Sequence, residues 1–289
     1  MKIIEPILIV GTGRCGTTLF HRLLARHPDV VWLSGVCNRR PDQPWLNRQI
    51  LRWDSMPFFS SILRRCFPPS ETTLYWEYLM PGFSNVRRDL SDSDLLTDTE
   101  ERAHRELGRH FIRGRTRQVH KFTGWPRLGF LLKLFPDARF IHVIRDGRAV
   151  ACSFLNVDWW LGWQGPENWL WGPLPPHYDE EWKESDRSFV VLSAIQWKIL
   201  MDAFETTRDV VPAGQLLELR YEDLTAEPEW TVRRALDFCG LEPSRRVTGG
   251  LVGVTFPNRN EKWKKQLTAE QQRLLQKSLA EHLRRYEYE

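Results

Sequence analysis

The chain has 289 residues, 42% hydrophobic and 27% charged, a balance typical of a globular protein with a sizeable core. Its 41 lysines and arginines exceed its 37 aspartates and glutamates by only four, too few to predict nucleic-acid binding. No apolar run approaches the ~20 residues of a membrane span, and we expect no signal peptide because the first residues lead almost directly into a strand pattern.

The five cysteines indicate a reducing compartment. They are Cys15, Cys37, Cys66, Cys152 and Cys239. Their number is odd and no pair has C-x-x-C spacing, so they form no evident disulfide or zinc framework. We therefore expect a cytoplasmic protein without an integral membrane segment.

The first predicted elements are a strand, a glycine-rich turn and a helix. The run "PILIVG" (residues 6–11) is short, apolar and β-branched, which predicts a buried strand. The following "RCGTTLFHRLLARH" (14–27) has apolar residues at helical spacing and is ended by Pro28. "VVWL" (30–33) predicts a second strand. This order is the beginning of an α/β unit.

Residues 35–95 are rich in proline, arginine and aromatic residues and predict an insertion with short helices. Thr97 and Glu100 then predict a capping box for a helix running to about Arg113. A second predicted insertion, about 157–185, contains six of the 14 tryptophans.

Strands and helices alternate along the rest of the chain. We expect strands at 117–122, 138–144 and 215–221, helices at 126–135, 145–155 and 228–240, a long amphipathic helix at 188–207, and a last helix begun by a Thr268–Gln271 capping box. The alternation predicts a P-loop-like three-layer α/β fold, with a central parallel sheet covered by helices on both faces. We expect one domain over residues 1–289.

The first glycine-rich loop fits more than one anion-binding motif. Gly11, Gly13 and Gly16 match the dinucleotide pattern G-x-G-x-x-G, but "LSGVCN" lacks the acid expected after the second strand. A nucleotide kinase needs a lysine where Thr17 stands. Alternatively, Arg14 supplies the charge and the threonines supply hydroxyl donors, which suits a phosphate or phosphosulfate without a metal. A glycine turn beside an exposed arginine is the non-functional alternative.

A second loop, in "FIHVIRDGRAVACSF" (140–154), repeats this pattern. Arg145 ends a predicted strand and Ser153 lies eight residues later, about two helical turns along. Their side chains could converge on one anion. Alternatively, Arg145 pairs with Asp146 or caps a helix.

Together these motifs resemble the sulfotransferases that use 3′-phosphoadenosine 5′-phosphosulfate (PAPS), in particular their bacterial and tyrosylprotein-like branch. In that family a loop reading roughly P-[RK]-S-G-T-T binds the 5′-phosphosulfate, similar to "GRCGTT" (13–18), and an arginine and serine eight residues apart bind the 3′-phosphate. The resemblance implies that the cofactor-binding residues are Arg14, Cys15, Gly16, Thr17, Thr18, Arg145, Ser153, Tyr221, Arg259, Lys262 and Trp263.

The sequence departs from the family pattern in two places. Cys15 stands where the first loop usually has a serine, which removes one hydroxyl donor and leaves the backbone amide. The acid often found after the second strand in tyrosylprotein-like members is missing from "WLSGVCNRR". The second departure leaves the general base open.

The catalytic candidates follow from the chemistry of sulfuryl transfer. By analogy with phosphoryl transfer, cations must neutralise charge on the leaving group, and Arg14 and Lys121 are the candidates. Lys121 could equally be a solvated strand-end lysine. Glu77, His120 and Asp158 are the alternatives for the base. Glu77 could instead be a surface carboxylate, and His120 a packed strand histidine pointing away from Lys121.

The sequence therefore predicts a metal-independent, PAPS-dependent sulfotransferase acting on a hydroxyl acceptor. The tryptophan-rich segment indicates an aromatic or lipid-like acceptor, although aromatic clusters also form ordinary cores. His104 and His110 lie six apart on one helix and would not share a face, so a metal pair is not expected. A nucleotide kinase and a catalytically silent nucleotide-binding module are the alternatives.

Overall fold

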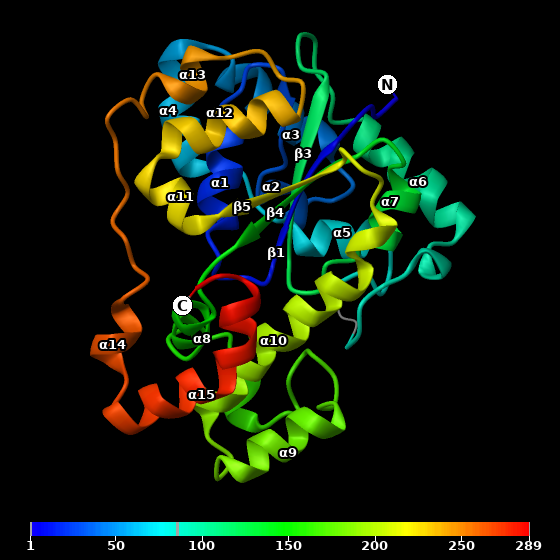
Figure 1. Ribbon diagram of the computed structural model, residues 1–289. Helices are drawn as coiled ribbons and strands as arrows, with labels where there is room; N and C mark the ends of the chain where they lie inside the picture. Colours follow the sequence, from blue (N-terminus) through cyan, green and yellow to red (C-terminus); the bar gives the residue numbers. More distant parts are fainter. Residues whose placement is uncertain (1, 85–86, 289) are drawn as a thin grey trace.

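A five-stranded parallel sheet lies at the centre of the molecule, which is described from a computed structural model over residues 2–84 and 87–288 (Figure 1). Its strands are β1 (Ile7–Gly11), β2 (Val30–Val31), β3 (Arg117–Thr123), β4 (Arg139–Ile144) and β5 (Leu216–Arg220). Their order is β2-β3-β1-β4-β5, so β1 lies between β3 and β4. The carboxyl ends of β1, β3 and β4 therefore meet at one edge.

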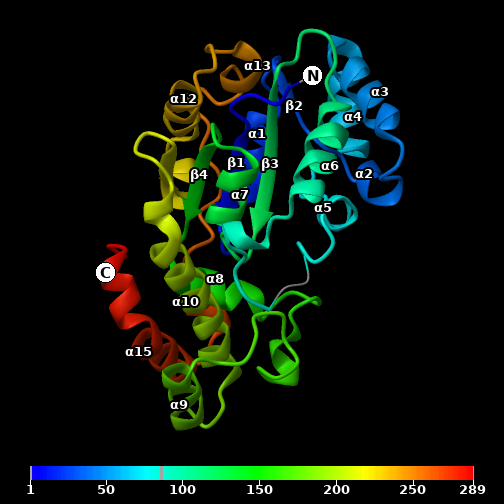
Figure 2. The ribbon, with the colours of Figure 1, turned by 90° about the vertical axis from the view of Figure 1, so that its right-hand side faces the viewer.

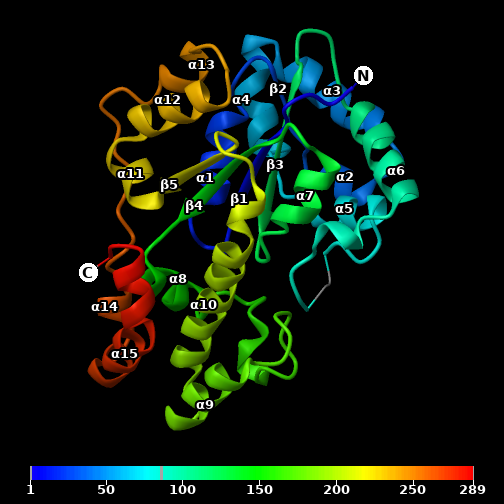
Figure 3. The ribbon, with the colours of Figure 1, turned by 45° about the vertical axis from the view of Figure 1, so that its right-hand side comes forward.

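Helices connect the strands and cover both faces of the sheet (Figures 2 and 3). They are α1 (Thr17–Leu24), α2 (Val36–Arg39), α3 (Pro44–Asp54), α4 (Pro57–Cys66), α5 (Thr73–Leu79), α6 (Thr97–Gly108), α7 (Leu128–Leu134), α8 (Gly147–Phe154), α9 (Pro176–Glu184), α10 (Phe189–Thr207), α11 (Tyr221–Ala226), α12 (Pro228–Phe238), α13 (Arg245–Thr248), α14 (Lys262–Gln266) and α15 (Ala269–Arg285). Short 3₁₀ turns are η1 (Asp92–Asp94), η2 (Leu161–Gln164) and η3 (Arg208–Val210). The predicted α/β fold is confirmed.

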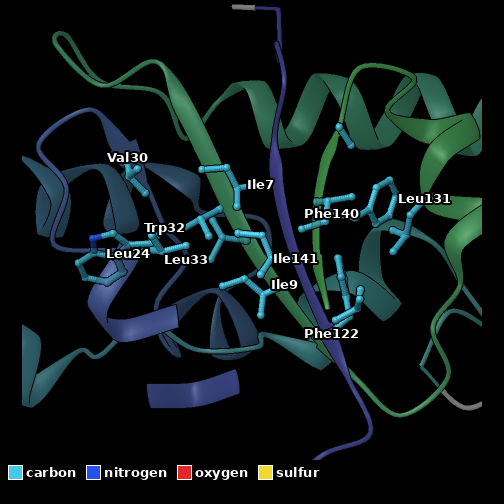
Figure 4. Close-up of a cluster of buried hydrophobic side chains, with 14 of the residues drawn as sticks. Ile7, Ile9, Leu24, Val30, Trp32, Leu33, Phe122, Leu131, Phe140 and Ile141 are labelled. Atoms are coloured by element: carbon cyan, nitrogen blue, oxygen red, sulfur yellow. The ribbon is translucent and has the colours of Figure 1, made fainter. Parts of the chain in front are cut away.

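The core lies on both faces of β1 and its neighbours. All five residues of β1 are buried, because α1 covers one face and α7 and α10 lie across the other. Figure 4 shows Ile7 and Ile9 of β1 beside Phe140 and Ile141 of β4. Continuous burial explains why the strand sequence is apolar at every position instead of alternating.

Several local predictions differ from the structure. The second strand is only two residues long. The helix expected from Thr97 to Arg113 ends at Gly108, and its capping box does not form because Thr97 is already helical and Leu96 occupies the cap position. The tryptophan-rich segment contains the unexpected helix α9. The Thr268–Gln271 capping box is confirmed by its two reciprocal hydrogen bonds.

The long helix α10 is buried on nearly every side. The sequence predicted an amphipathic helix here, and this prediction is wrong. Every residue from Val190 to Met201 is buried, because α8, α15, α7 and α9 all pack against it. Two of its buried polar side chains have partners inside the protein: Lys198 pairs with Glu181 at 2.5 Å, and the side-chain oxygen of Gln196 accepts from Trp160.

One buried ion network attaches the 35–95 insertion to the sheet. Asp54, at the end of α3, is fully buried and accepts from Arg64 Nε at 2.6 Å and from Arg115 Nη2 at 2.7 Å. Arg115 also donates to the carbonyl of Val30 in β2. Burial acts to raise the pKa of Asp54, but the hydrogen bonds and charges of the two arginines outweigh it and lower that pKa.

Asp54→Asn is expected to destabilise the protein by about 3 kcal/mol at pH 7, because it leaves two partly buried guanidinium groups facing a neutral amide. A carboxylate with a lowered folded-state pKa contributes stability above its unfolded pKa of about 4, and loses it as the pH falls. The difference between wild type and variant in urea unfolding should therefore be full near neutrality and shrink below about pH 4.

Asp237→Asn, at an exposed position on α12, is the control. It should change the free energy of unfolding by no more than about 0.5 kcal/mol. Equal, small effects of both substitutions would contradict the importance of the buried network.

Candidate active site

The first glycine-rich loop connects β1 to α1 in a conformation that brings its backbone close to Tyr221. Gly13, Arg14 and Gly16 have φ values of 83°, 56° and 93°, in the left-handed region. A Cβ atom at Gly16 would lie 2.4 Å from the ring of Tyr221. The position therefore requires glycine both for its φ and for this close approach.

Cys15 does not present its side chain to the cavity beside this loop. Its thiol is fully buried, and burial raises its pKa. The sulfur lies inside the turn, where a Cβ added to Gly11 would be 2.6 Å away. The side chain at this position therefore faces the core, and Cys15, expected among the cofactor-binding residues, is not one of the residues that line the cavity.

The second loop brings Arg145 and Ser153 to the first. Arg145 donates to the carbonyl of Arg14 at 2.7 Å, and its guanidinium lies 4.2 Å from the ring centroid of Tyr221. Ser153 Oγ accepts from Arg14 Nε at 2.9 Å. The alternative partner Asp146 is taken by Arg148, at 2.8 Å, and caps α8. Arg145 and Ser153 therefore converge as their spacing predicted.

These two loops and the segment before α14 enclose a cavity of about 450 Å³. Nine of the predicted residues line it: Arg14, Gly16, Thr17, Thr18, Arg145, Ser153, Tyr221, Arg259 and Lys262. Four of these are cations, and the lining contains no carboxylate. A positive cavity with exposed loop backbone and a tyrosine ring suits a nucleotide bearing separated anionic groups.

Trp263 is not among the lining residues. Its ring is buried in a cluster with Leu275 and Leu279 of α15, and the guanidinium of Arg148 lies 5.3 Å from the ring centroid. Lys262, its neighbour, reaches the cavity instead. The apolar ring is more stable in this cluster than facing a charged cavity.

A buried lysine links the first loop to a carboxylate that sequence reasoning missed. Lys121 Nζ donates to Thr18 Oγ1 at 3.1 Å and pairs with Glu71 Oε2 at 2.8 Å. Glu71 also accepts from the backbone amide and the hydroxyl of Thr123, both at 2.7 Å. In the sequence, Glu71 lies between two prolines and α5, far from any predicted strand. Its distance along the chain from Lys121 therefore gave no indication that the two side chains are in contact.

Glu71 faces a second cavity of about 410 Å³ on the other side of the first loop. Its walls are largely aromatic: Trp76, Phe83, Phe122, Trp125, Phe154, Trp159 and Trp171. Thr12 and Gly13 line this cavity, whereas Arg14 and Gly16 line the first one. The first loop is thus a wall shared by the two cavities. The side-chain contacts Thr18–Lys121 and Lys121–Glu71 connect one cavity with the other.

The three carboxylate and histidine candidates for a base lie elsewhere. Glu77 accepts from the amides of Gly82 and Ser84 at 2.7 and 2.8 Å, which holds the turn after α5. Asp158 is exposed and does not line the aromatic cavity.

His120 is buried as a packed strand residue. It shares a hydrogen bond with Gln118 and packs edge-on against Trp76, and burial lowers its pKa to about 3. The alternation with Lys121 that pointed it away from the site is therefore seen in the structure.

The two histidines considered as a metal pair form hydrogen bonds with other partners. His104 binds the carbonyl of Leu134, and His110 the hydroxyl of Tyr75. Over residues 2–84 and 87–288, no group of three or more His, Cys, Asp or Glu side chains could hold a metal ion. Within the same ranges, no helix has the length and apolar character needed to cross a bilayer.

The tryptophans of the 157–185 segment lie in different surroundings. Trp159 and Trp171 line the aromatic cavity. Trp160 and Trp169 are instead buried in apolar clusters around α8 and α10. Trp163 is exposed.

Comparisons with known proteins agree with this geometry. The model of the sulfotransferase family matches residues 6–245. The omega-hydroxy-beta-dihydromenaquinone-9 sulfotransferases Stf3 of Mycobacterium bovis and Mycobacterium tuberculosis are each 26% identical over 312 aligned positions, covering 98% of this chain and 75% of theirs.

Solved structures share the fold. Sulfotransferase STF9 from Mycobacterium avium superposes with a TM-score of 0.59 at 16% identity, covering 98% of this chain and 77% of that one. Sulfotransferase STF1 from Mycobacterium tuberculosis gives 0.53 at 18% identity, covering 96% and 77%. The family match spans most of the chain and includes both glycine-containing loops, so this protein belongs to the sulfotransferase family and is a sulfotransferase.

Proposed function

We propose that the chain transfers the sulfuryl group of PAPS to a hydroxyl of an aromatic or lipid-like acceptor. The observation that carries this proposal is the shared wall: the first loop has a cationic cavity on one side and an aromatic cavity with a carboxylate on the other. A donor and an acceptor bound in these cavities would meet at Lys121, which contacts residues of both.

The residues of the cationic cavity fit this nucleotide. The amides of the first loop, at the amino end of α1, suit the 5′-phosphosulfate, and Thr17 and Thr18 add hydroxyls. Arg145 and Ser153 suit the 3′-phosphate, with the ring of Tyr221 beside the base. Arg259 and Lys262 would close over the ligand from the segment before α14.

Asn260 supports this arrangement from behind. It accepts from Arg145 Nε at 2.9 Å and donates to Glu222, which also accepts from the amide of Asp146. The network fixes the guanidinium of Arg145 before any ligand arrives, which lowers the cost of ordering on binding.

Each catalytic role falls to a group on the shared wall or beside it. PAPS supplies an activated sulfuryl group attached to a phosphate leaving group. Lys121 and Arg14 would stabilise the negative charge that develops on that phosphate. Glu71 would take the proton of the acceptor hydroxyl, because its carboxylate lies in the aromatic cavity and contacts Lys121. Holding both substrates in line supplies the rest of the acceleration.

An apolar hydroxyl acceptor is supported by two observations. The acceptor-side cavity is walled by tryptophan and phenylalanine rings. The two Stf3 relatives are named for omega-hydroxy-beta-dihydromenaquinone-9, a hydroxylated lipid-like molecule. The cytoplasmic location, the independence from metals and the single-domain organisation expected from the sequence remain predictions.

Transfer of ³⁵S from labelled PAPS to a panel of phenols and long-chain primary alcohols, measured in excess EDTA, tests the proposal. We expect labelled sulfate esters and no inhibition by EDTA. Magnesium-dependent ATP turnover without binding of adenosine 3′,5′-bisphosphate would establish the kinase alternative. Tight binding of the bisphosphate without transfer to any acceptor would establish a catalytically silent module.

Arg145→Ala is expected to weaken binding of adenosine 3′,5′-bisphosphate by several-fold to a hundredfold, the loss of roughly 1–3 kcal/mol of charged hydrogen bonding. Isothermal titration calorimetry measures the effect. Arg113→Ala, an exposed arginine in the turn before β3, should leave the affinity unchanged. An unchanged affinity for Arg145→Ala would remove this residue from the nucleotide site.

Glu71→Gln is expected to lower kcat by roughly 10²–10⁴-fold, because the amide keeps the shape of the side chain but cannot accept a proton. Affinity for the bisphosphate should change little. Glu77→Gln is the matched control, and it should leave kcat nearly unchanged. A large loss in Glu77→Gln with little loss in Glu71→Gln would reverse the assignment of the base.

A further inference from the structure

An exposed apolar surface lies on α3, on α4 and on the turn between them. Its side chains are Trp45, Trp53, Met56, Phe58, Phe59 and Ile62, and Phe58 is 89% exposed. Contiguous exposed apolar side chains, unlike single scattered ones, mark interaction sites. We call this set the α4 apolar surface.

The same segment is strongly basic. Residues 39–67 contain six arginines and two aspartates, a net charge of +4 that equals the net charge of the whole chain. Asp54 is fully buried and pairs with Arg64, which leaves five arginines and Asp42 in the segment and the same net charge of +4. The exposed part of the segment is thus both apolar and cationic.

An arginine-lined cavity of about 950 Å³ adjoins α4. Its lining includes five arginines and no acidic residue. They are Arg22 of α1, Arg26 just after α1, Arg64 and Arg65 of α4, and Arg246 of α13. Partial burial and the neighbouring charge of Arg64 lower the pKa of Arg26. In the described parts of the chain, Arg22, Arg26 and Arg65 form no ion pair with a carboxylate. Such a cluster favours a bound anion.

This region is separate from the active site. In Figure 1, α4 and α13 lie at the top of the molecule, whereas α8 and α14, which border the cationic active-site cavity, lie below the sheet. The two cavities share no lining residue. Figure 2 shows α3 and α4 together at the outer edge of the structure.

We propose that the α4 apolar surface and the adjoining arginine cavity dock the protein on the surface of an anionic phospholipid bilayer. Helices that carry tryptophan and phenylalanine beside arginine lie in the plane of the membrane interface. The aromatic and aliphatic side chains enter the boundary between headgroups and acyl chains, and the arginines bind headgroup phosphates. The proposal goes beyond the sulfuryl transfer and does not depend on it.

Charge and apolar character together favour a bilayer over other partners. A second copy docked on the same surface by a twofold axis would set these arginines against themselves. A free phosphate would occupy the arginine cavity but leave Phe58 and Ile62 in water. A bilayer containing anionic lipid satisfies both parts of the surface at once.

Co-sedimentation of the full chain with vesicles tests this proposal. The vesicles contain phosphatidylcholine alone, or phosphatidylcholine with about a third phosphatidylglycerol, whose negative surface attracts basic segments. We expect binding to the anionic vesicles only. Raising NaCl from about 0.1 M to about 1 M, which shortens the Debye length from ~10 Å to ~3 Å, should weaken it strongly.

Two double variants separate the apolar and the charged contributions. Phe58→Ser with Ile62→Ser, and Arg26→Glu with Arg65→Glu, should each weaken vesicle binding roughly tenfold or more. All four side chains are exposed or partly exposed, and the transfer of sulfate to soluble acceptors should be unaffected. Thermal unfolding verifies that the variants are folded.

The controls carry the same chemical changes elsewhere on the surface. Leu96→Ser with Val210→Ser matches the apolar change, and Arg273→Glu with Lys277→Glu on α15 matches the charge change. Both should bind anionic vesicles like wild type. Equal binding to neutral and anionic vesicles, binding of inorganic phosphate without vesicle binding, or a dimer abolished by the Phe58 and Ile62 changes would each overturn the proposal.

Discussion

The ammonium group of Lys121 holds the two halves of the active site together. Lys121 lies on β3 beside Ile9 of β1, two positions before the end of its strand. Its ammonium group reaches both Thr18 and Glu71. An ammonium group this buried needs acceptors, and it obtains one from Thr18 of the cationic cavity and one from Glu71 of the aromatic cavity. A change in either partner therefore alters the surroundings of this buried ammonium group.

The parallel sheet is what makes this contact possible. β3 and β4 flank β1, so the loops that follow β1 and β4 and the end of β3 emerge at the same edge. The amide of Gly124 bonds the carbonyl of Gly11, which fixes the ends of β1 and β3 relative to each other. From this edge, α1 and α8 present their amino ends and Arg145 turns back over the first loop. Binding at the carboxyl ends of strands is the general behaviour of open α/β sheets.

Sequence reasoning reached those parts of the site whose geometry is local. The spacing of Arg145 and Ser153 across the start of a helix, and the replacement of the P-loop lysine by Thr17, both reflect contacts within one strand–loop–helix unit. Cys15 shows where such reasoning stops, because only the packing against Gly11 reveals that its side chain faces inward. Trp263 shows the same limit, since its burial depends on α15, which follows later in the chain.

Glu71 could not be found from the pattern because its position depends on long-range packing. The insertion that carries it is attached to β2 through Asp54 and Arg115, and this attachment brings the segment after α4 to the end of β3. The fold class, by contrast, followed from apolar strands alternating with helices, a signal repeated along the whole chain. The low apolar periodicity of α10 has a similar long-range cause, because helices from four parts of the chain surround it.

A crystal structure of the protein with adenosine 3′,5′-bisphosphate and an apolar alcohol bound would test most directly whether the first loop is the wall between donor and acceptor. The result expected is a 5′-phosphate on the amides of the first loop, a 3′-phosphate between Arg145 and Ser153, and the alcohol hydroxyl beside Glu71. A nucleotide bound away from these loops, or an acceptor hydroxyl remote from Glu71 and Lys121, would contradict this arrangement.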